Sequence, residues 1–281
     1  MEKNHRHRVR GITLNYKNVL VINSDIMKRL VTGPRKKVES ELRYGFVPNG
    51  GRVYYTKRSQ PPFLTPMVYS YYNHTGNLDF VRDNIQTLEE EYKFWCTNRT
   101  VAVTKDGQVH WLNRYDTETN TPRPESYVED IATATGVDEG SKEAIYSNLA
   151  SAAESGWDFS SRWFSPNSTI SLKSIITKDT VPVDLNALLC MNEKLLSTFY
   201  GLLGNKAKQQ AYKRRVTERQ AAIKAILWNS RAGIWQDYSL SRATHRDDFY
   251  PSNIFPLFVG CYDVDIDTKT KSSVILRLKG F

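Results

Sequence analysis

The sequence predicts an all-α fold with long loops and a few short strands. The first observation is that apolar residues recur at intervals of three and four, the pattern of amphipathic helices, over residues 78–95, 183–203 and 206–228. The second is that strand-like stretches are confined to residues 101–103 and 109–111. The third is that long polar or proline-containing segments separate the helices. Periodicity alone leaves a helical toroid and a simple bundle both open.

The first predicted helix runs from Leu78 to Trp95, with Gly76 and Asn77 as a break before it. Its apolar positions are Leu78, Val81, Ile85, Leu88, Tyr92 and Trp95. The strand-like stretches follow, one on each side of Gly107. Residues 113–137 are polar and contain prolines, which predicts a long loop. Loops of that length in compact domains are usually functional or disordered.

The remaining helices lie in the second half of the chain. A helix over residues 141–154 is expected because Ser141 opens it and Glu143 stands in its first turn. A loop with prolines separates it from the helix over 183–203, which Gly204 ends. The helix over 206–228 comes directly afterwards.

Charge is distributed unevenly along the 281 residues. The net charge is +9, but residues 1–60 hold 14 Lys and Arg against 4 Asp and Glu, and the other 221 residues hold 25 against 26. Such a concentration at one end is more typical of a solvated, poorly ordered segment than of a nucleic-acid-binding arm. We therefore expect no nucleic-acid partner. Hydrophobic content of 40% and charged content of 25% are those of a globular protein.

Cysteines and sequons restrict the chemistry further. Cys96, Cys190 and Cys261 are too widely spaced for a metal site or a disulfide framework, although one disulfide stays open. No stretch has the length of a membrane span, and we see no signal peptide, since the best apolar run near the start, residues 19–22, is too short. The three N-glycosylation sequons, at Asn73, Asn98 and Asn167, are about as many as chance would give.

Asp158 is the first candidate for chemistry. It stands between Trp157 and Phe159, after the predicted helix 141–154. Aromatic neighbours disfavour the charged form of a carboxyl and raise its pKa, which suits a general acid. Arg162 nearby would act in the opposite direction. The alternative is a structural aspartate that caps a turn, which is the commoner role of Asp in a loop.

Two other segments offer binding groups. Residues 48–52 and 58–62 combine a Gly-Gly turn with amide, hydroxyl and guanidinium groups, a mixture that suits the hydroxyls of a sugar. In residues 122–126, prolines on both sides of Arg123 restrict the backbone and lower the entropy cost of holding Arg123 and Glu125 toward a ligand. The alternatives are an ordinary polar turn in the first case and an exposed ion pair in the second.

Together these segments resemble the trehalases, in particular the animal enzymes of the insect type. The shared motifs, in the order seen in that family, are Pro-Asn-Gly at 48–50, Arg-Ser-Gln-Pro-Pro at 58–62, Pro-Arg-Pro-Glu-Ser at 122–126, Glu-Ser-Gly-Trp-Asp-Phe-Ser-Ser-Arg-Trp at 154–163 and Val-Pro-Val-Asp-Leu-Asn at 181–186. The resemblance implies part of an (α/α)6 toroid and hydrolysis of α,α-trehalose to two glucose molecules with inversion. It also implies that Asp158 is the general acid and that no metal or organic cofactor is used. The substrate-binding residues that it implies are Asn49, Arg58, Ser59, Gln60, Arg123, Pro124, Glu125 and Gly156.

The chain departs from the family at both ends. The family's upstream Gly-rich motif, its Gln-Trp-Asp signature and its catalytic base, a glutamate, have no match. We therefore expect a divergent basic segment over residues 1–43, an incomplete trehalase-like catalytic domain over 44–263 and an unmatched tail over 264–281. An inverting glycosidase needs two carboxyl groups, so little or no activity is expected of this chain, and a catalytically inactive sugar-binding fragment is the alternative. The family implies an extracellular or membrane-associated protein, with membrane contact only through segments absent here, and leaves the oligomeric state open.

Overall fold

The computed structural model describes residues 44–166 and 171–262 of the chain. The predicted basic segment 1–43, the tail 264–281 and the sequon at Asn167 lie outside these residues. The two other sequon asparagines, Asn73 and Asn98, are both exposed near the ends of helices. Within the described residues, no helix is both long enough and apolar enough to cross a membrane.

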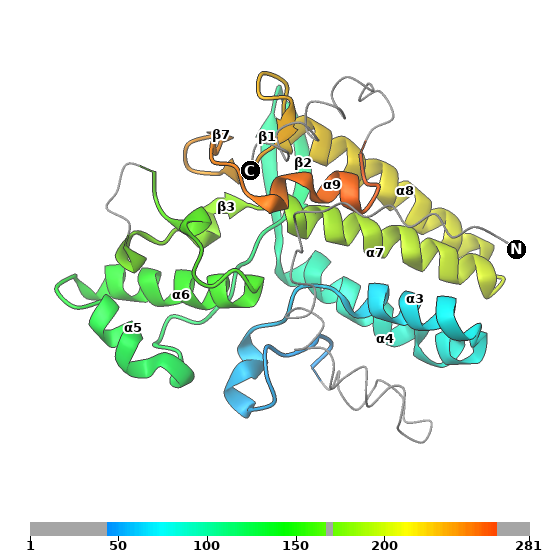
Figure 1. Ribbon diagram of the computed structural model, residues 1–281, viewed down its shortest axis with the longest axis horizontal. Helices are drawn as coiled ribbons and strands as arrows, with labels where there is room; N and C mark the ends of the chain where they lie inside the picture. The colour runs from blue at the N-terminus through cyan, green and yellow to red at the C-terminus, as the bar shows by residue number, and fades with distance from the viewer. Residues whose placement is uncertain (1–43, 167–170, 263–281) are drawn as a thin grey trace, which may run out of the picture. The chain divides into compact units, whose positions relative to one another are not determined.

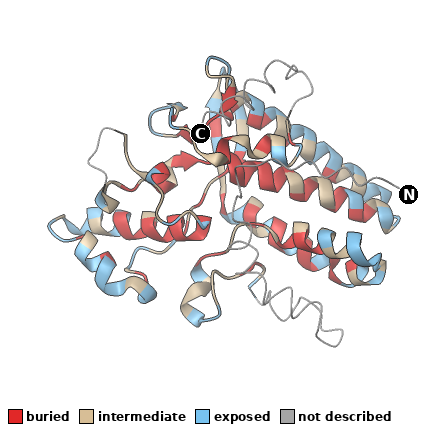
Figure 2. Cartoon of the chain, viewed as in Figure 1, coloured by how far each residue is buried: buried red, intermediate tan, exposed pale blue. Residues whose placement is uncertain are grey.

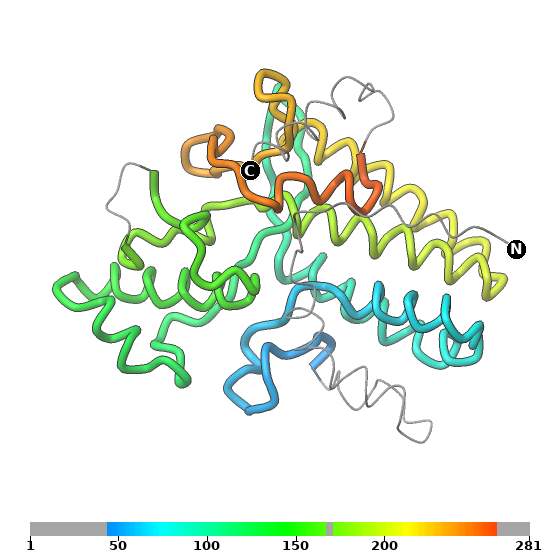
Figure 3. The backbone as a smooth tube through the Cα atoms, in the orientation of Figure 1, coloured from blue at the N-terminus to red at the C-terminus, as the bar shows by residue number. Residues whose placement is uncertain are grey.

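The described residues are mostly helical, as predicted, and Figures 1 and 3 show the path of the chain. The α-helices are α3 (Leu64–Thr75), α4 (Leu78–Asn98), α5 (Tyr127–Thr133), α6 (Glu139–Ser155), α7 (Val183–Leu202), α8 (Lys206–Ala222) and α9 (Phe255–Phe258). The four predicted helices correspond to α4, α6, α7 and α8 and are confirmed. The last of them changes to a π-helical turn over Ile223–Leu227 before it ends.

Strands are few and short. The longest pair, β1 (Thr100–Lys105) and β2 (Gln108–Asn113), forms an antiparallel hairpin in which Thr100 lies opposite Asn113. Asp106 and Gly107 make its turn with φ of 51° and 74°, the positive values that a two-residue hairpin turn of type I′ requires. The other strands have two residues each: β3 (Thr180–Val181), β4 (Trp228–Asn229), β5 (Ile234–Trp235), β6 (Tyr238–Ser239) and β7 (Thr244–His245). They pair as β3–β6–β7 and β4–β5.

Helix α7 is the centre of the packing. It contacts α3, α4, α8 and α9, and Figure 2 shows buried residues along almost its whole length. A helix that is buried on nearly all sides must be enclosed by other elements, and the leucines at 185, 188, 189 and 196 supply much of its apolar surface. Helix α8 folds back beside α7, and most of its polar residues are exposed, with the exception of the buried Arg219.

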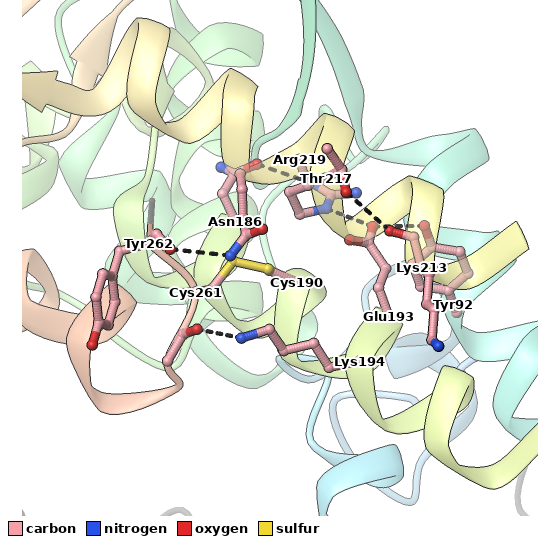
Figure 4. The surroundings of a disulfide bond; sticks show 12 residues. Tyr92, Asn186, Cys190, Glu193, Lys194, Lys213, Thr217, Arg219, Cys261 and Tyr262 are labelled. Carbon is pink, nitrogen blue, oxygen red and sulfur yellow. Dashed lines mark hydrogen bonds and ion pairs between the residues drawn. A yellow bond between two sulfur atoms is a disulfide. The ribbon is translucent and has the colours of Figure 1, made fainter. Parts of the chain in front are cut away.

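A disulfide bond fastens the segment after α9 to α7. It joins Cys190 to Cys261, whose Cα atoms are 6.2 Å apart and which are 71 residues apart in sequence (Figure 4). Both cysteines are fully buried. The disulfide that the sequence left open is therefore formed, and Cys96 is the free cysteine.

Candidate active site

Asp158 lies on a loop that begins where α6 ends. Gly156 ends the helix with φ of 70°, a left-handed conformation that glycine adopts without a steric penalty. The chain then turns through Trp157 and Asp158 into a 3-10 turn at Ser161–Trp163. The side chain of Asp158 is exposed. The predicted position of this residue on a helix-end loop is confirmed.

The aromatic enclosure expected around Asp158 is not formed by the described residues. The ring of Trp157 lies 5.1 Å from the guanidinium carbon of Arg162, and the ring of Phe159 lies 4.8 Å from that of Arg123. Both rings are therefore used to stack on cations, which leaves the carboxyl of Asp158 open to solvent.

A buried ion cluster of Arg162, Asp184 and Asp237 holds the loop that carries Asp158. Arg162 has no exposed surface and donates to both oxygens of Asp184, at 2.8 Å each, and to both oxygens of Asp237, at 2.5 and 2.8 Å. Burial acts against the charged guanidinium, but the two carboxylates outweigh it and hold the pKa of Arg162 above its ordinary value. The indole N–H of Trp163 donates to the carbonyl of Trp157 at 3.2 Å. The residue before Asp158 is thus held by a ring contact and a hydrogen bond.

The segment that contains Asn49 is hydrogen-bonded to the end of α6. The Asn49 amide donates to the carbonyl of Ala153 at 3.2 Å and to that of Ser59 at 3.0 Å, and its oxygen accepts from Nε of Arg58 at 3.0 Å. The Gln60 amide donates to the carbonyl of Asn49 at 2.8 Å. These bonds join residues 49, 58, 59 and 60 into one polar unit.

Ser59 is held by a buried carboxylate. Its backbone N–H and its hydroxyl both donate to Oε1 of Glu154, each at 2.9 Å. Arg99 donates to the two oxygens of the same carboxylate at 2.8 Å each. Glu154 has no exposed surface, so Arg99 supplies the opposite charge that a buried carboxylate needs.

The Arg123 segment joins both loops. Glu125 forms an ion pair with Arg58, and Arg123 stacks on Phe159. Arg123 itself is buried, and its Nε and Nη2 donate to the two oxygens of Asp130 at 2.9 and 2.7 Å. The expected alternative, an exposed ion pair between Arg123 and Glu125, is therefore wrong, since each of the two has another partner.

The predicted binding residues differ in how they are placed. Asn49, Arg58, Ser59, Gln60 and Glu125 form one connected network of hydrogen bonds and ion pairs around the end of α6. Arg123 reaches the residue after Asp158. Pro124 is exposed and begins a short 3-10 turn, while Gly156 lies beside Pro61.

Comparison with known proteins identifies the family. The Trehalase family model matches residues 28–281, beyond the limits of 44–263 that the motifs mark. The chain belongs to the trehalase family. Trehalase of Oryctolagus cuniculus is 51% identical over 221 residues, and the match covers 78% of this chain and 38% of that protein. Trehalase of Pimpla hypochondriaca is 48% identical over 224 residues, covering 79% and 38%. The chain thus spans about two fifths of the length of these trehalases.

The fold agrees with that of a solved trehalase. The neutral trehalase of Saccharomyces cerevisiae superimposes with a TM-score of 0.61 at 20% sequence identity, over 83% of this chain and 46% of that one. The partial (α/α)6 toroid implied by the family resemblance is therefore confirmed.

Sequence reasoning missed the charged residues beneath the loops of this trehalase-family chain. They are Arg99, Glu154, Asp184 and Asp237, of which Glu154 and Asp184 were noted only as parts of the family motifs, and Arg162 was noted only as a neighbour of Asp158. A signal was present, because Asp184 stands within an apolar run from Val181 to Leu189. A charge inside such a run is buried by its neighbours and needs an opposite charge. The partner cannot be read from the sequence, since Asp237 is 75 residues away from Arg162.

Proposed function

We propose that the protein containing this chain hydrolyses α,α-trehalose to two glucose molecules with inversion. Asp158 is the general acid, which protonates the glycosidic oxygen as the bond to the leaving glucose breaks. The substrate-binding groups are Asn49, Arg58, Ser59, Gln60, Arg123, Pro124, Glu125 and Gly156. Membership of the trehalase family supports this assignment.

One observation carries the proposal: three segments far apart in sequence meet beside Asp158. Arg58 pairs with Glu125 across 67 residues, and Asn49 bonds to Ala153 across 104 residues. Arg123 then stacks on Phe159, next to Asp158. Polar side chains held in this way on either side of the loop that carries Asp158 would bind the hydroxyls of two sugar rings while its carboxyl approaches the oxygen between them.

The proton has to be held on Asp158 until the bond breaks. Asp158 is exposed, so its carboxyl is accessible to the glycosidic oxygen of a bound disaccharide. Inversion also requires a second carboxylate about 6.5–9.5 Å from the first, with room for the attacking water. Asp158 supplies the acid, and none of the described residues is assigned the role of base.

Asp158→Asn in the protein that contains this chain tests the assignment. The amide keeps the shape of the side chain but cannot donate the proton, so glucose release from trehalose should fall by about 10²–10⁴-fold. Asp106→Asn is the matched control, because Asp106 is also exposed but lies in the β1–β2 turn, where Asn tolerates the positive φ. Glucose release that Asp158→Asn leaves unchanged contradicts the proposal. Proton NMR of the first product formed checks inversion, which predicts one β-glucose for each trehalose cleaved.

The alternative is a sugar-binding protein without turnover. The open position of Asp158, with no neighbouring carboxylate assigned as base, favours it for the described residues taken alone. It predicts that trehalose binds with equal affinity to the parent protein and to Asp158→Asn, and that neither releases glucose.

The location that fits these residues is outside the cytosol, free or at a membrane. Structural disulfides persist in oxidising compartments, and Cys190–Cys261 is such a bond. A relative from Salmonella typhi, 40% identical over 245 residues, bears the name putative periplasmic trehalase. Alkylation of the native protein before reduction, followed by mass spectrometry, tests whether the protein carries this disulfide, as an oxidising compartment would allow. Blocking of Cys96 alone is expected, whereas blocking of all three cysteines would contradict it.

A further inference from the structure

A pocket outside the Asp158 loops opens between α4, α8 and the β1–β2 hairpin. Its volume is about 580 Å³, within the range of small-molecule sites. Tyr92 and Cys96 line it from α4, Trp111 from β2, and Glu193 from α7. A second hollow of about 450 Å³ shares Tyr92 and Cys96 and continues along α4 and α8. None of the proposed trehalose-binding residues lines either hollow.

The carboxylate of Glu193 is only half satisfied. Its Oε1 accepts from the Tyr92 hydroxyl at 2.7 Å and from Nε of Arg219 at 2.6 Å, and Figure 4 shows these three side chains together near the disulfide. Its Oε2 is buried and has no hydrogen-bond partner among the residues that the structure describes. Burial raises the pKa of Glu193 despite the neighbouring Arg219. A buried acceptor without a donor is costly, and a ligand hydroxyl that reaches it removes the cost.

The charges around the pocket cancel. Glu193 and Glu218 oppose Arg215 and Arg219, and these four are its charged lining residues. A pocket lined by equal numbers of positive and negative groups has no net attraction for an anion or a cation, but it offers hydrogen-bond donors and acceptors to a neutral polar molecule. The balance of charge therefore favours a neutral polar ligand over phosphates and amines.

Trp111 adds a flat apolar face. Trp111 is 65% exposed, although tryptophan side chains in folded proteins are on average highly buried. An aromatic face beside hydrogen-bonding groups fits a ligand with an apolar ring face and polar edges. We propose that this pocket is a second carbohydrate site, which binds a neutral sugar ring against Trp111 with a ring hydroxyl donating to Glu193.

Cys96 provides a direct readout, because it lines the pocket and the other two cysteines are joined in the disulfide. Burial raises the pKa of its thiol, so alkylation is followed by mass spectrometry at mildly alkaline pH. Glucose and trehalose should slow the labelling of Cys96 several-fold in a saturable manner. Sorbitol, which has the hydroxyls without the ring face, should not. Equal slowing by sorbitol, or no slowing by either sugar, overturns the proposal.

Substitutions then locate the sugar. Trp111→Ala should raise the sugar concentration for half protection by about tenfold, equivalent to about 1.4 kcal/mol. Phe258→Ala, which removes another exposed aromatic side chain outside the pocket, should change nothing. Because Trp111 is exposed, its removal should leave the fold intact, which circular dichroism checks. Protection that Trp111→Ala leaves unaltered contradicts the proposal.

The proposal is independent of the catalytic assignment. Asp158→Asn should keep the protection of Cys96 in full, and loss of protection in that variant would place the sugar at the Asp158 loop and overturn the second site. Failure of Asp158→Asn to reduce glucose release bears only on the catalytic role.

Discussion

Arg162 and Asp184 face each other as a pair with two hydrogen bonds, Nη1 to Oδ2 and Nη2 to Oδ1, both 2.8 Å long and both buried. The same guanidinium binds Asp237 and stacks on Trp157. One arginine therefore connects the start of α7, the β5–β6 segment and the loop that carries Asp158. The arrangement makes the position of the Asp158 loop depend on a fully buried charge.

Replacing Arg162 with Leu should unfold or severely destabilise the chain. Two carboxylates, Asp184 and Asp237, would be left buried without an opposite charge, a situation that typically costs about 3–5 kcal/mol. Urea denaturation followed by circular dichroism measures the free energy of unfolding. Arg82→Leu is the control, because Arg82 pairs with Asp79 at the surface, where ion pairs contribute at most about 1 kcal/mol. Equal stability of the two variants would show that the cluster is not structural.

Replacing Glu125 with Gln should weaken trehalose binding with little effect on stability. Glu125 is partly exposed and pairs with Arg58, and Arg58 keeps its bond to Asn49 and its stacking on Tyr55 in the variant. The expected loss of affinity is about tenfold, or about 1.4 kcal/mol. Calorimetric titration with trehalose measures it.

The control for this prediction is Glu118→Gln, an exposed glutamate on the same loop. It should bind trehalose as the parent protein does. An affinity that Glu125→Gln leaves unchanged, with the fold intact, would remove Glu125 from the binding site.

What could be predicted from the sequence depended on the range of the interaction. Helix α4 was predictable because its buried positions repeat every three or four residues. Helix α3 was not, since Tyr69, Tyr71 and Tyr72 and the neighbouring Ser, Asn and Thr are weak helix formers. Its packing against α4 and α7 supplies the stability instead.

In the candidate site too, features that are local in sequence were predictable and contacts between distant residues were not. The motif containing Asp158 and the motifs containing Asn49 and Arg123 could be found because each is contiguous in sequence. The hydrogen bond that Ser59 donates to Glu154 spans 95 residues, and nothing local in either segment identifies the other as its partner. Likewise, the aromatic neighbours of Asp158 suggested an enclosed carboxyl, but the fold turns both rings toward arginines.

Reducing the disulfide should destabilise the chain. Cys190–Cys261 closes a loop of 71 residues, and a loop of that size predicts a loss of about 4 kcal/mol through the greater entropy of the unfolded chain. The double variant Cys190→Ala with Cys261→Ala should melt at a lower temperature than the parent protein. Cys96→Ser is the control and should melt with the parent, because Cys96 forms no disulfide. Identical melting of all three proteins would show that the bond contributes nothing.

Glu91 should make the stability of the chain fall as pH rises through neutrality. It is buried on α4, and neither of its carboxylate oxygens has a hydrogen-bond partner among the described residues. Burial alone raises the pKa of Glu91 to about 8, from an ordinary value of 4.5. The folded chain therefore holds a proton that the unfolded chain releases.

The loss of stability with rising pH follows from that difference in bound protons. Below the ordinary pKa both states are protonated and the stability is fully present; above it, unfolding is favoured by about 1.4 kcal/mol for each pH unit until the folded-state pKa is reached. Urea denaturation at a series of pH values between the two should show this loss for the parent protein. Glu91→Gln should remove that part of the slope, because glutamine does not titrate. Glu90→Gln, an exposed neighbour on the same helix, should keep it. A slope that is equal in Glu91→Gln and in the parent would mean that Glu91 is charged in the folded chain and that a donor reaches it.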